Sequence, residues 1–386
     1  MKIALLGPAP PMRGGIAAHS RGLLRELESN GHDTLLVSWR RPYPPGARGY
    51  QLIDEDPSAL LDVLNPVAWR RAARQLVEQA PDVLVVQWWH PVTAPCLAWV
   101  LAFCRGAGLD APVLVVCHNH TPHEYFPGSR SLTRLLLGRA DGLLAHSRWV
   151  ATELGRRYPS AALRSCPMPV LEDYSMSFPG RDEARKRLGL DNSGVVFLAA
   201  GHLRRYKGVE LLLASWARSG LGNEGAVLIL AGSDYLPARA RRRLLSSLGP
   251  SCRLIDHYLD DDELATLLAA SDVAVSPCLR ASQSGFLPLA EASGLALLAS
   301  DAGGLAEQLK GGARQQLFAA GNPADLCRAL QRSAQTAVSG PPGGGWDTDR
   351  VKKSWQQTVQ TLEDELKGLL WRQDTGIAAA GRSGVL

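Results

Sequence analysis

An isolated carboxylate and an amide lie in one apolar stretch of the second half of the chain. In SQSGFLPLAEA, residues 282–292, Glu291 stands between alanines and follows Gln283 by eight positions. A carboxylate accepts a hydrogen bond from each of two vicinal hydroxyl groups, so Glu291 is suited to hold the ribose of a nucleotide. The alternative is a partly buried glutamate whose charge is satisfied by an arginine or by the backbone.

The same stretch contains a turn that leads into a predicted helix. Ser284 and Gly285 precede Phe286, and Pro288 falls in the first helical turn. The first N–H groups of a helix have no partner within the helix and carry partial positive charge, which favours an anion. We therefore predict a binding site for a negatively charged group at the start of this helix.

A second turn, GHLRRYKG at residues 201–208, gathers cations between a predicted strand and a predicted helix. It contains Arg204, Arg205 and Lys207. Arginine can bind two oxygens of a phosphate, and lysine acts as a point charge. These residues are suited to clamp a diphosphate, and a solvated basic turn explains them equally well.

Imidazole groups are concentrated in CHNHTPHE, residues 117–124, directly after an apolar strand. The segment contains His118, His120, His123 and Glu124. Neither an H-E-x-x-H pattern nor a paired cysteine motif accompanies them, so we predict no metal site. Hydrogen bonding to the hydroxyl groups of a sugar fits this set better.

Two further features carry weaker signals. Gly14 and Gly15 precede a predicted helix, where missing side chains let a phosphate or a sugar approach the backbone. A simple turn is the more common meaning of such a pair. The acids of LDDDEL, residues 259–264, are interpreted as a helix cap by Asp260 or Asp261 rather than as a Mg²⁺ site.

These turns are positioned by two series of alternating strands and helices. Apolar strands are predicted within residues 2–7, 33–39, 82–89, 112–119 and 141–147, and again within 194–201, 226–232, 252–258 and 273–278. Continuous apolar strands separated by helices predict doubly wound parallel sheets, in which ligands bind beyond the carboxyl ends of the strands. Prolines cluster in residues 165–180, where we expect the linker between two domains.

The composition narrows the function classes. The 386 residues carry a formal net charge of +5 without a dense basic block, which argues against nucleic acid as a partner. The seven cysteines are scattered and unpaired in spacing, as in a reducing compartment. The first apolar run is too short for a signal peptide, and polar residues and prolines interrupt residues 83–104, so we expect a cytoplasmic protein.

Taken in order, the motifs resemble those of the large retaining glycosyltransferase family four. The similar segments extend over nearly the whole chain: GG before LLRELESNGHD, HN followed by PHE, ADGLLAHS, GHLRRYKGVELLLA, LAASDVAVSP and LAEASGLALLASDAGGLAE. The resemblance implies the GT-B fold, an α/β fold of two Rossmann-like, doubly wound domains that face a central cleft. It implies an acceptor-binding domain over 1–168, a donor-binding domain over 169–346, a helix over 347–372 that crosses back to the first domain, and a flexible tail over 373–386.

The resemblance also implies roles for individual residues. Gly15 matches the glycine near the donor phosphates, and His118 matches the histidine beside the donor sugar. Catalytic roles are expected for His118, Arg204 and Lys207. Donor binding is expected from Gly15, Gln283, Ser284, Gly285, Phe286 and Glu291. Secondary candidates are Gly14, His123, Glu124 and Arg205.

Two positions depart from the family pattern. His202 stands where an arginine often follows the strand-end glycine, so Arg204 is taken as the partner of Lys207. Gln283 stands where the first glutamate of an acid pair touches the donor sugar. Because an amide still binds hydroxyl groups as donor and acceptor, we predict altered sugar recognition rather than lost catalysis.

The expected function is the transfer of a sugar from a nucleoside diphosphate to an acceptor hydroxyl. The resemblance implies a retaining, metal-independent enzyme without a cofactor. We expect it to act on a sugar or lipid-linked glycan in the synthesis of cell-envelope or extracellular polysaccharide or glycolipid. A nucleotide-sugar 2-epimerase and a non-catalytic nucleotide-sugar-binding scaffold are the alternatives. No oligomeric state is predicted.

A basic helix suggests a place for the protein at a membrane. Trp69, Arg70, Arg71 and Arg74 lie close together in the sequence, and such a helix suits the anionic inner face of a membrane, where lipid-linked acceptors reside. A solvated helix face is the more common meaning of such a run.

Overall fold

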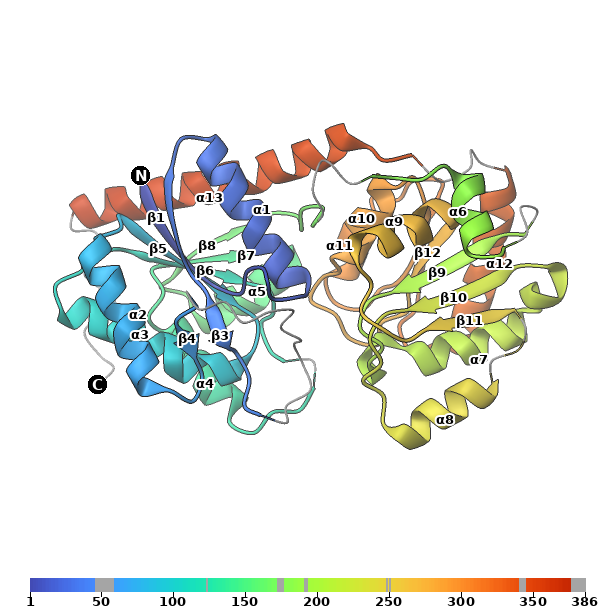
Figure 1. Cartoon of the computed structure of the whole chain (residues 1–386), viewed down its shortest axis with the longest axis horizontal. Helices are drawn as coiled ribbons and strands as arrows, with labels where there is room; N and C mark the ends of the chain where they lie inside the picture. Colours follow the sequence, from blue (N-terminus) through green and yellow to red (C-terminus); the bar gives the residue numbers. More distant parts are fainter. Residues whose placement is uncertain are drawn as a thin grey trace. The chain divides into compact units, whose positions relative to one another are not determined.

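The structure is a computed structural model whose chain divides into two compact units. Unit 1 comprises Met1–Leu171 and Ser354–Leu386, and unit 2 comprises Glu172–Lys353 (Figure 1). The structure describes residues 1–45, 59–122, 124–171, 177–190, 194–247, 249, 251–339 and 345–375. The expected flexible tail, apart from residues 373–375, lies outside these ranges.

Unit 1 is built on a parallel sheet with the strand order β2-β1-β5-β6-β7-β8. Its strands are β1 (Lys2–Leu6), β2 (Asp33–Val37), β5 (Val83–Trp88), β6 (Val113–Cys117), β7 (Gly142–Ala145) and β8 (Ala162–Ser165). The short strands β3 (Trp39–Arg41) and β4 (Leu61–Asp62) pair separately. Its helices are α1 (Gly15–Ser29), α2 (Pro66–Gln79), η1 (Pro91–Thr93), α3 (Ala94–Gly106), α4 (Ser129–Leu137) and α5 (Arg148–Arg157).

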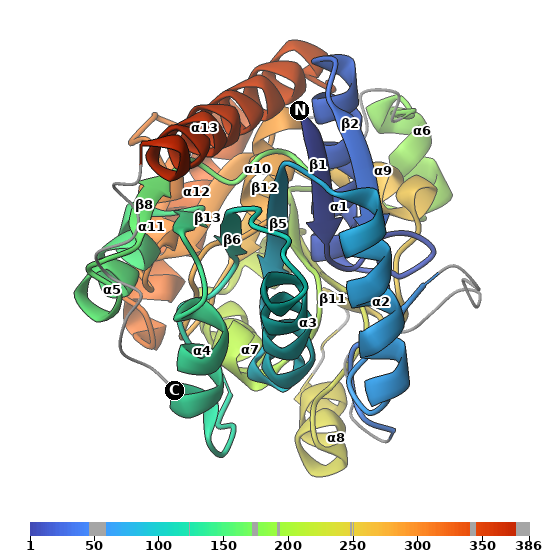
Figure 2. The ribbon, with the colours of Figure 1, turned by 90° about the vertical axis from the view of Figure 1, so that its left-hand side faces the viewer.

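The central strands of unit 1 are buried along their whole length. Every residue of β5 and of β6 is buried, as in a parallel sheet that helices cover on both faces. Helices α2, α3 and α4 lie side by side (Figure 2). The start of α2 has a local cause in the sequence: the side chain of Asn65 accepts hydrogen bonds from the N–H groups of Val67 and Ala68, and Pro66 is the first helical residue.

The last helix, α13 (Thr348–Asp374), packs one apolar face into the protein core. The residues of this face are buried: Val351, Trp355, Val359, Leu362, Leu366 and Leu369. In unit 1, α1 lies close to α13 because Gly22 has no side chain. A Cβ atom at Gly22 would lie 2.2 Å from Cζ2 of Trp355.

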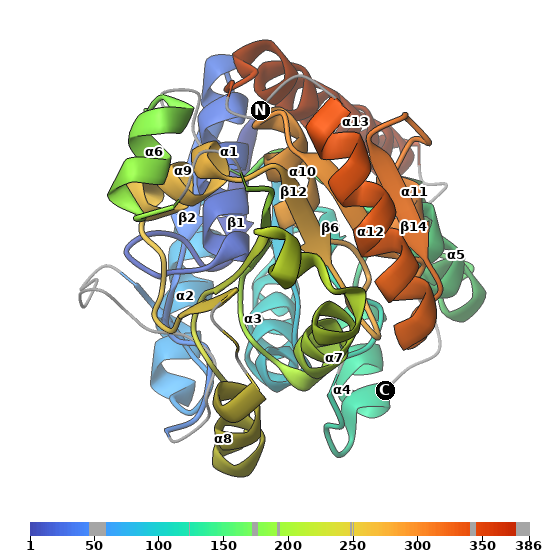
Figure 3. The same cartoon turned by 90° about the vertical axis from the view of Figure 1, so that its right-hand side faces the viewer.

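Unit 2 repeats the architecture with the strand order β11-β10-β9-β12-β13-β14. Its strands are β9 (Val196–Ala200), β10 (Val227–Ala231), β11 (Cys252–Ile255), β12 (Val273–Ser276), β13 (Ala296–Ser300) and β14 (Gln315–Phe318). Its helices are α6 (Arg181–Arg187), η2 (Arg205–Lys207), α7 (Val209–Ser219), η3 (Leu221–Glu224), α8 (Ala238–Ser247), α9 (Asp261–Ala270), α10 (Phe286–Ala292), α11 (Leu305–Gln308) and α12 (Pro323–Ser339). Helix α7 packs beside α12, and α6 packs beside α9 (Figure 3).

The predicted doubly wound parallel sheets are thus present in both units. In unit 1 the strand order reverses between β1 and β5, and in unit 2 it reverses between β9 and β12. Ligands of such sheets bind beyond the carboxyl ends of the strands at this switch point. Within the described part of the chain, no helix combines the length and the hydropathy needed to cross a membrane.

Candidate functional site

The loops that follow β9 and β12 form a pocket at the switch point of unit 2. Lys207 comes from the first loop, and Ser284 and Phe286 come from the second. The pocket is lined by Ala199, Ala200, Gly201, His202, Leu203, Lys207, Val209, Leu212, Val275, Ser276, Pro277, Cys278, Ser284 and Phe286. Two of the predicted loops therefore meet at one place, although Lys207 and Ser284 are 77 positions apart in the sequence.

The backbone around Lys207 is held against the end of β12. Gly208 has φ 74°, and a Cβ atom there would lie 1.9 Å from the carbonyl oxygen of Pro277, so only glycine fits. The N–H of Leu279 donates to the carbonyl oxygen of Tyr206 at 2.7 Å. The electrostatic interaction with the nearby sulfur of Cys278 raises the pKa of the Lys207 amine. Lys207 is therefore charged at neutral pH.

Arg204 is oriented by an aromatic ring that the sequence did not single out. Its guanidinium carbon lies 4.3 Å from the centroid of the Tyr235 ring, and the His202 ring meets the same tyrosine edge-on at 5.1 Å. Burial, together with the positive charges of Arg204 and Lys207, lowers the pKa of His202 to about 4. His202 is thus neutral where the family often has an arginine, and Arg205 is exposed.

The start of α10 differs from the expected row of free backbone N–H groups. The Ser284 hydroxyl accepts from the N–H groups of Phe286 and Leu287 at 3.2 and 3.4 Å. The amide of Gln308 binds both the N–H and the carbonyl of Ser284, at 2.7 and 2.8 Å. The prediction overlooked that the Ser284 hydroxyl, one residue before the N-cap Gly285, itself binds the first N–H groups of the helix. Gln308, 24 residues later, carried no local signal of this role.

Glu291 is engaged inside unit 2. Its Oε2 lies 2.7 Å from Nη1 of Arg350, and its Oε1 accepts from Nε2 of Gln315 at 3.0 Å. The arginine partner that the sequence left open as an alternative is present, and Glu291 does not line the pocket around Lys207. Its side chain is 23% exposed, and a carboxylate has about four lone-pair positions, so two contacts leave capacity for a further donor.

The remaining predictions in unit 2 are placed as follows. Gln283 and Gly285 are half-buried on the loop before α10. The acidic segment caps a helix as predicted: the Asp260 side chain accepts from the N–H of Glu263, and the Glu263 carboxylate accepts from the N–H of Asp260. No function in metal binding follows from these acids.

The glycine pair lies at the switch point of unit 1. Gly14, with φ 120°, caps α1, and Gly15 is its first residue. A Cβ atom at Gly15 would lie 3.2 Å from Cδ1 of Leu171. The positive φ of Gly14 and the close approach of Leu171 each account for a glycine here, and a role in binding phosphate stays a prediction.

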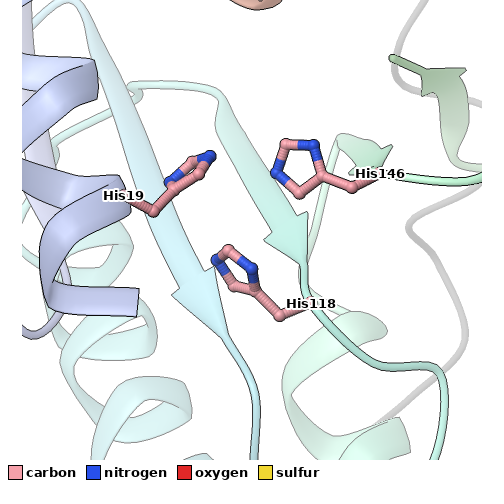
Figure 4. Close-up of side chains that lie close together, drawn as sticks. All are labelled: His19, His118 and His146. Atoms are coloured by element: carbon pink, nitrogen blue, oxygen red, sulfur yellow. The ribbon is translucent and has the colours of Figure 1, made fainter. Parts of the chain in front are cut away.

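His118 follows β6 and lies in a buried cluster with His19 of α1 and His146, which follows β7 (Figure 4). The ring centroids are 4.8 to 5.4 Å apart, and at most 5% of each residue is exposed. Burial and the neighbouring imidazoles lower the pKa of His19 and His118, and burial lowers that of His146 to about 4. All three rings are therefore neutral at pH 7.

Gln87 of β5 connects two members of this histidine cluster. Its Oε1 lies 2.5 Å from Nε2 of His118, and its Nε2 lies 3.2 Å from Nδ1 of His19. The sequence predicts no metal, but these three histidines each bring one potential ligand atom to within 4.8 Å of the others, the one such group in the part of the chain that the structure describes. An amide inside an otherwise apolar strand was the available sequence signal for this network.

The other polar residues near His118 do not join the cluster. The His120 ring packs edge-on against Trp149 at 4.6 Å, and burial lowers the pKa of His120. Glu124 is exposed. His123 lies outside the described residues.

Comparison with known proteins follows the division into two units. A model described as Glycosyltransferase Family 4 matches residues 13–170, and one described as Glycosyl transferases group 1 matches residues 194–336. A D-inositol 3-phosphate glycosyltransferase of Streptomyces bingchenggensis is 28% identical over 242 residues, which cover 59% of this chain and 53% of that protein. The chain thus spans about half the length of this relative.

Two solved structures illustrate the similarity in fold. The catalytic domain of starch synthase IV from Arabidopsis thaliana, bound to ADP and acarbose, has a TM-score of 0.71 at 15% identity and covers 96% of this chain and 99% of that one. The HepE protein of Anabaena in complex with UDP and glucose has a TM-score of 0.66 at 16% identity, with 95% and 100% covered. The predicted GT-B type of fold, with two Rossmann-like sheets, is confirmed.

Proposed function

The chain belongs to the glycosyltransferase family four, also called group 1, and from this membership we propose that it transfers a sugar from a nucleoside diphosphate sugar to an acceptor hydroxyl. The proposed donor class agrees with the UDP, glucose and ADP found in the two similar structures. Unit 2 is proposed to hold the donor, and the acceptor is proposed to bind unit 1. The proposed acceptor is a sugar or lipid-linked glycan.

The observation that carries this proposal is the position of Lys207. Its loop meets the loop of Ser284 and Phe286 at the switch point of the unit 2 sheet, where such sheets bind ligands. As the sugar departs, negative charge grows on the β-phosphate, and a fixed cation stabilises that charge more in the transition state than in the ground state. Arg204, stacked on Tyr235, is the proposed second cation.

We propose that the reaction needs no metal and proceeds with retention at the anomeric carbon. Lys207 and Arg204 supply the charge that a metal ion would otherwise provide to the diphosphate. The departing phosphate is proposed to take the proton of the acceptor hydroxyl on the same face of the sugar. His118 is neutral and acts as a hydrogen-bonding group beside the donor sugar rather than as a charged one.

Recognition of the donor is assigned to the second loop and its helix. Glu291 is proposed to accept hydrogen bonds from ribose hydroxyls through the lone pairs that Arg350 and Gln315 leave available. Gln283 is proposed to contact the sugar itself. Its amide can donate as well as accept, which favours a sugar hydroxyl pattern that a glutamate would not read.

We also propose that the protein acts at the cytoplasmic face of a membrane, in the synthesis of a polysaccharide or glycolipid. Arg70 and Arg71 are exposed on α2, and apolar side chains are exposed nearby, with Val67 61% and Leu64 53% accessible. Basic and apolar side chains together favour an anionic lipid surface.

The test is a panel of nucleotide sugars, first as a thermal-shift screen and then as a transfer assay with NMR of the product. The donor that raises the melting temperature should be consumed with retained anomeric configuration. Lys207→Ala should lower turnover about 10²- to 10³-fold, whereas Lys186→Ala, which removes an exposed lysine of α6 in the same unit, should not.

Other results would reject the proposal in different ways. An isomerised nucleotide sugar without transfer would identify a 2-epimerase. Binding without any conversion would identify a scaffold. Transfer at the wild-type rate by the Lys207→Ala variant would remove the role of the lysine.

A further inference from the structure

We propose that Gln87 is a positioning residue for His118 and that its amide fixes which nitrogen carries the proton in both His118 and His19. The catalytic consequence rests on the function proposed above. Gln87 is fully buried in β5, and the two ends of its amide contact the two rings, at 2.5 Å for His118 and 3.2 Å for His19. Figure 4 shows the rings of the cluster gathered between their three elements.

The bridge fixes the tautomers because one end of an amide accepts a hydrogen bond and the other donates it. Oε1 of Gln87 accepts from a protonated Nε2 of His118. Nε2 of Gln87 donates to an unprotonated Nδ1 of His19, whose proton is then on Nε2. If the amide is turned end for end, both protons move to Nδ1. In either arrangement His19 and His118 have the same tautomer.

The same bridge restricts what the histidine cluster binds. A metal ion needs an unprotonated nitrogen from each of its histidine ligands. With the amide in place, either His19 or His118 uses its unprotonated nitrogen to accept the hydrogen bond from Gln87. Its other nitrogen carries the proton, so that ring has no nitrogen left for a metal ion. The Nε2 atoms of His19 and His146 are buried without a hydrogen-bond partner. All three rings can therefore hold a metal ion only after the bridge is broken.

The space for the amide is provided by the neighbouring strand. Gly7 follows β1, which pairs with β5 through Leu6 and Val86. A Cβ atom at Gly7 would lie 2.6 Å from Cγ and 2.9 Å from Cβ of Gln87. The glutamine side chain therefore fills a volume that the glycine leaves open, and it contacts the His118 ring from a strand that is paired on both sides.

Loss of the bridge should leave the fold intact and remove the hydrogen bond between Gln87 and the His118 ring. His118 would keep its place in the chain but lose the contact that sets its orientation and its protonated nitrogen. Because a displacement of about 1 Å at a reacting centre lowers rates by about 10²-fold, we expect a fall of this size in turnover with a smaller change in KM.

The first experiment needs no substrate. Long-range ¹H–¹⁵N spectra of the imidazoles at pH 7 should show His19 and His118 as neutral rings with the same tautomer. Gln87→Leu should release both rings into a tautomer mixture; Gln87→Met, also without an amide, serves where the leucine variant does not fold. Thr93→Val removes the hydrogen bond that the buried Thr93 hydroxyl donates to the His90 carbonyl at 2.8 Å, and it should leave these signals unchanged.

Three outcomes of this experiment would overturn the proposal. The first is a pair of opposite tautomers for His19 and His118 in the wild-type protein. The second is an unchanged spectrum in both Gln87 variants. The third is stoichiometric binding of Co²⁺ by the wild-type protein with histidine ligands in its visible spectrum, because that requires the bridge to be absent.

The second experiment is a double-mutant cycle on turnover. If Gln87 acts through His118, the double variant Gln87→Leu with His118→Ala should match His118→Ala alone. If the losses of turnover in the two single variants multiply in the double variant, Gln87 acts independently of His118 and the positioning role is wrong. If the wild-type protein transfers no sugar, the proposed function is wrong. The spectra still test whether Gln87 gives His19 and His118 the same tautomer.

Discussion

A substitution at Gly208 tests how the turn at residues 201–208, which carries Lys207, is held against the loop after β12. Its Cβ position lies 1.9 Å from the Pro277 carbonyl oxygen, and real Cβ contacts are not shorter than 3.0 Å, so Gly208→Ala must separate the two loops by about 1 Å. An alanine at φ 74° adds about 1–2 kcal/mol of backbone strain. Overpacking against the backbone adds about 1–3 kcal/mol. We expect unfolding free energy to fall by about 2–5 kcal/mol.

Gly220 provides the matched control. It has φ 75° at the end of α7, and a Cβ atom there meets nothing within 4 Å. Gly220→Ala should therefore show the backbone strain alone, about 1–2 kcal/mol. Urea unfolding measures both variants, and the transfer assay should show a loss of about 10²-fold for Gly208→Ala only, because Lys207 moves with its loop. Equal stability losses, or normal turnover by Gly208→Ala, would refute the reasoning.

The remaining predictions concern unit 1. The pKa of each ring in the histidine cluster is lowered on folding, so the unfolded state binds protons first; stability should be full above pH 6.5 and should be lost as the pH falls toward about 4, the pKa of His146. Urea unfolding of the wild-type protein at pH 7 and pH 5 measures this loss of stability. The free energy of unfolding of the His146→Asn variant should change less between the two pH values. An equal change in both proteins would show that His146 is not responsible for it. Gly22→Ala brings a Cβ to 2.2 Å from the buried Trp355 ring and should destabilise the protein by about 1–3 kcal/mol, whereas Gly106→Ala, in open space at the end of α3, should not. Equal melting temperatures of these two variants would show that α1 does not pack on α13 in this way.

The elements of the fold were predictable where local signals agree. The central strands read as unbroken apolar runs because helices cover the sheets, and Asn65 with Pro66 marks the start of α2 in the sequence itself. Strand β14, with the sequence QQLF, was not predicted because it is short and begins with two polar residues, and only its last residue is fully buried. Its strand character comes from pairing with β13, which is a tertiary effect.

The candidate site was predictable as a set of loops but not as a set of contacts. Lys207, Ser284 and Phe286 follow from the rule that loops after neighbouring strands meet. The partners of these residues depend on long-range register: Arg350 reaches Glu291 from the start of α13, and Tyr235 reaches Arg204 from the loop after β10. No spacing in the sequence predicts such contacts, because many polar residues are equally plausible partners for each side chain until the folded structure brings one of them close.

The charges of the two units divide the chemistry of the proposed reaction between them. The polar residues at the sheet of unit 1 form a neutral, buried network in which His118 has an internal partner in Gln87. The polar residues at the switch point of unit 2 include Lys207, whose pKa is raised, in a pocket beside a neutral His202. A neutral imidazole can orient a sugar but cannot offset the charge of a departing diphosphate. In the proposed reaction the charge that stabilises the leaving group is therefore assigned to Lys207 of unit 2, and we expect the rate to depend on Lys207 even when His118 is removed.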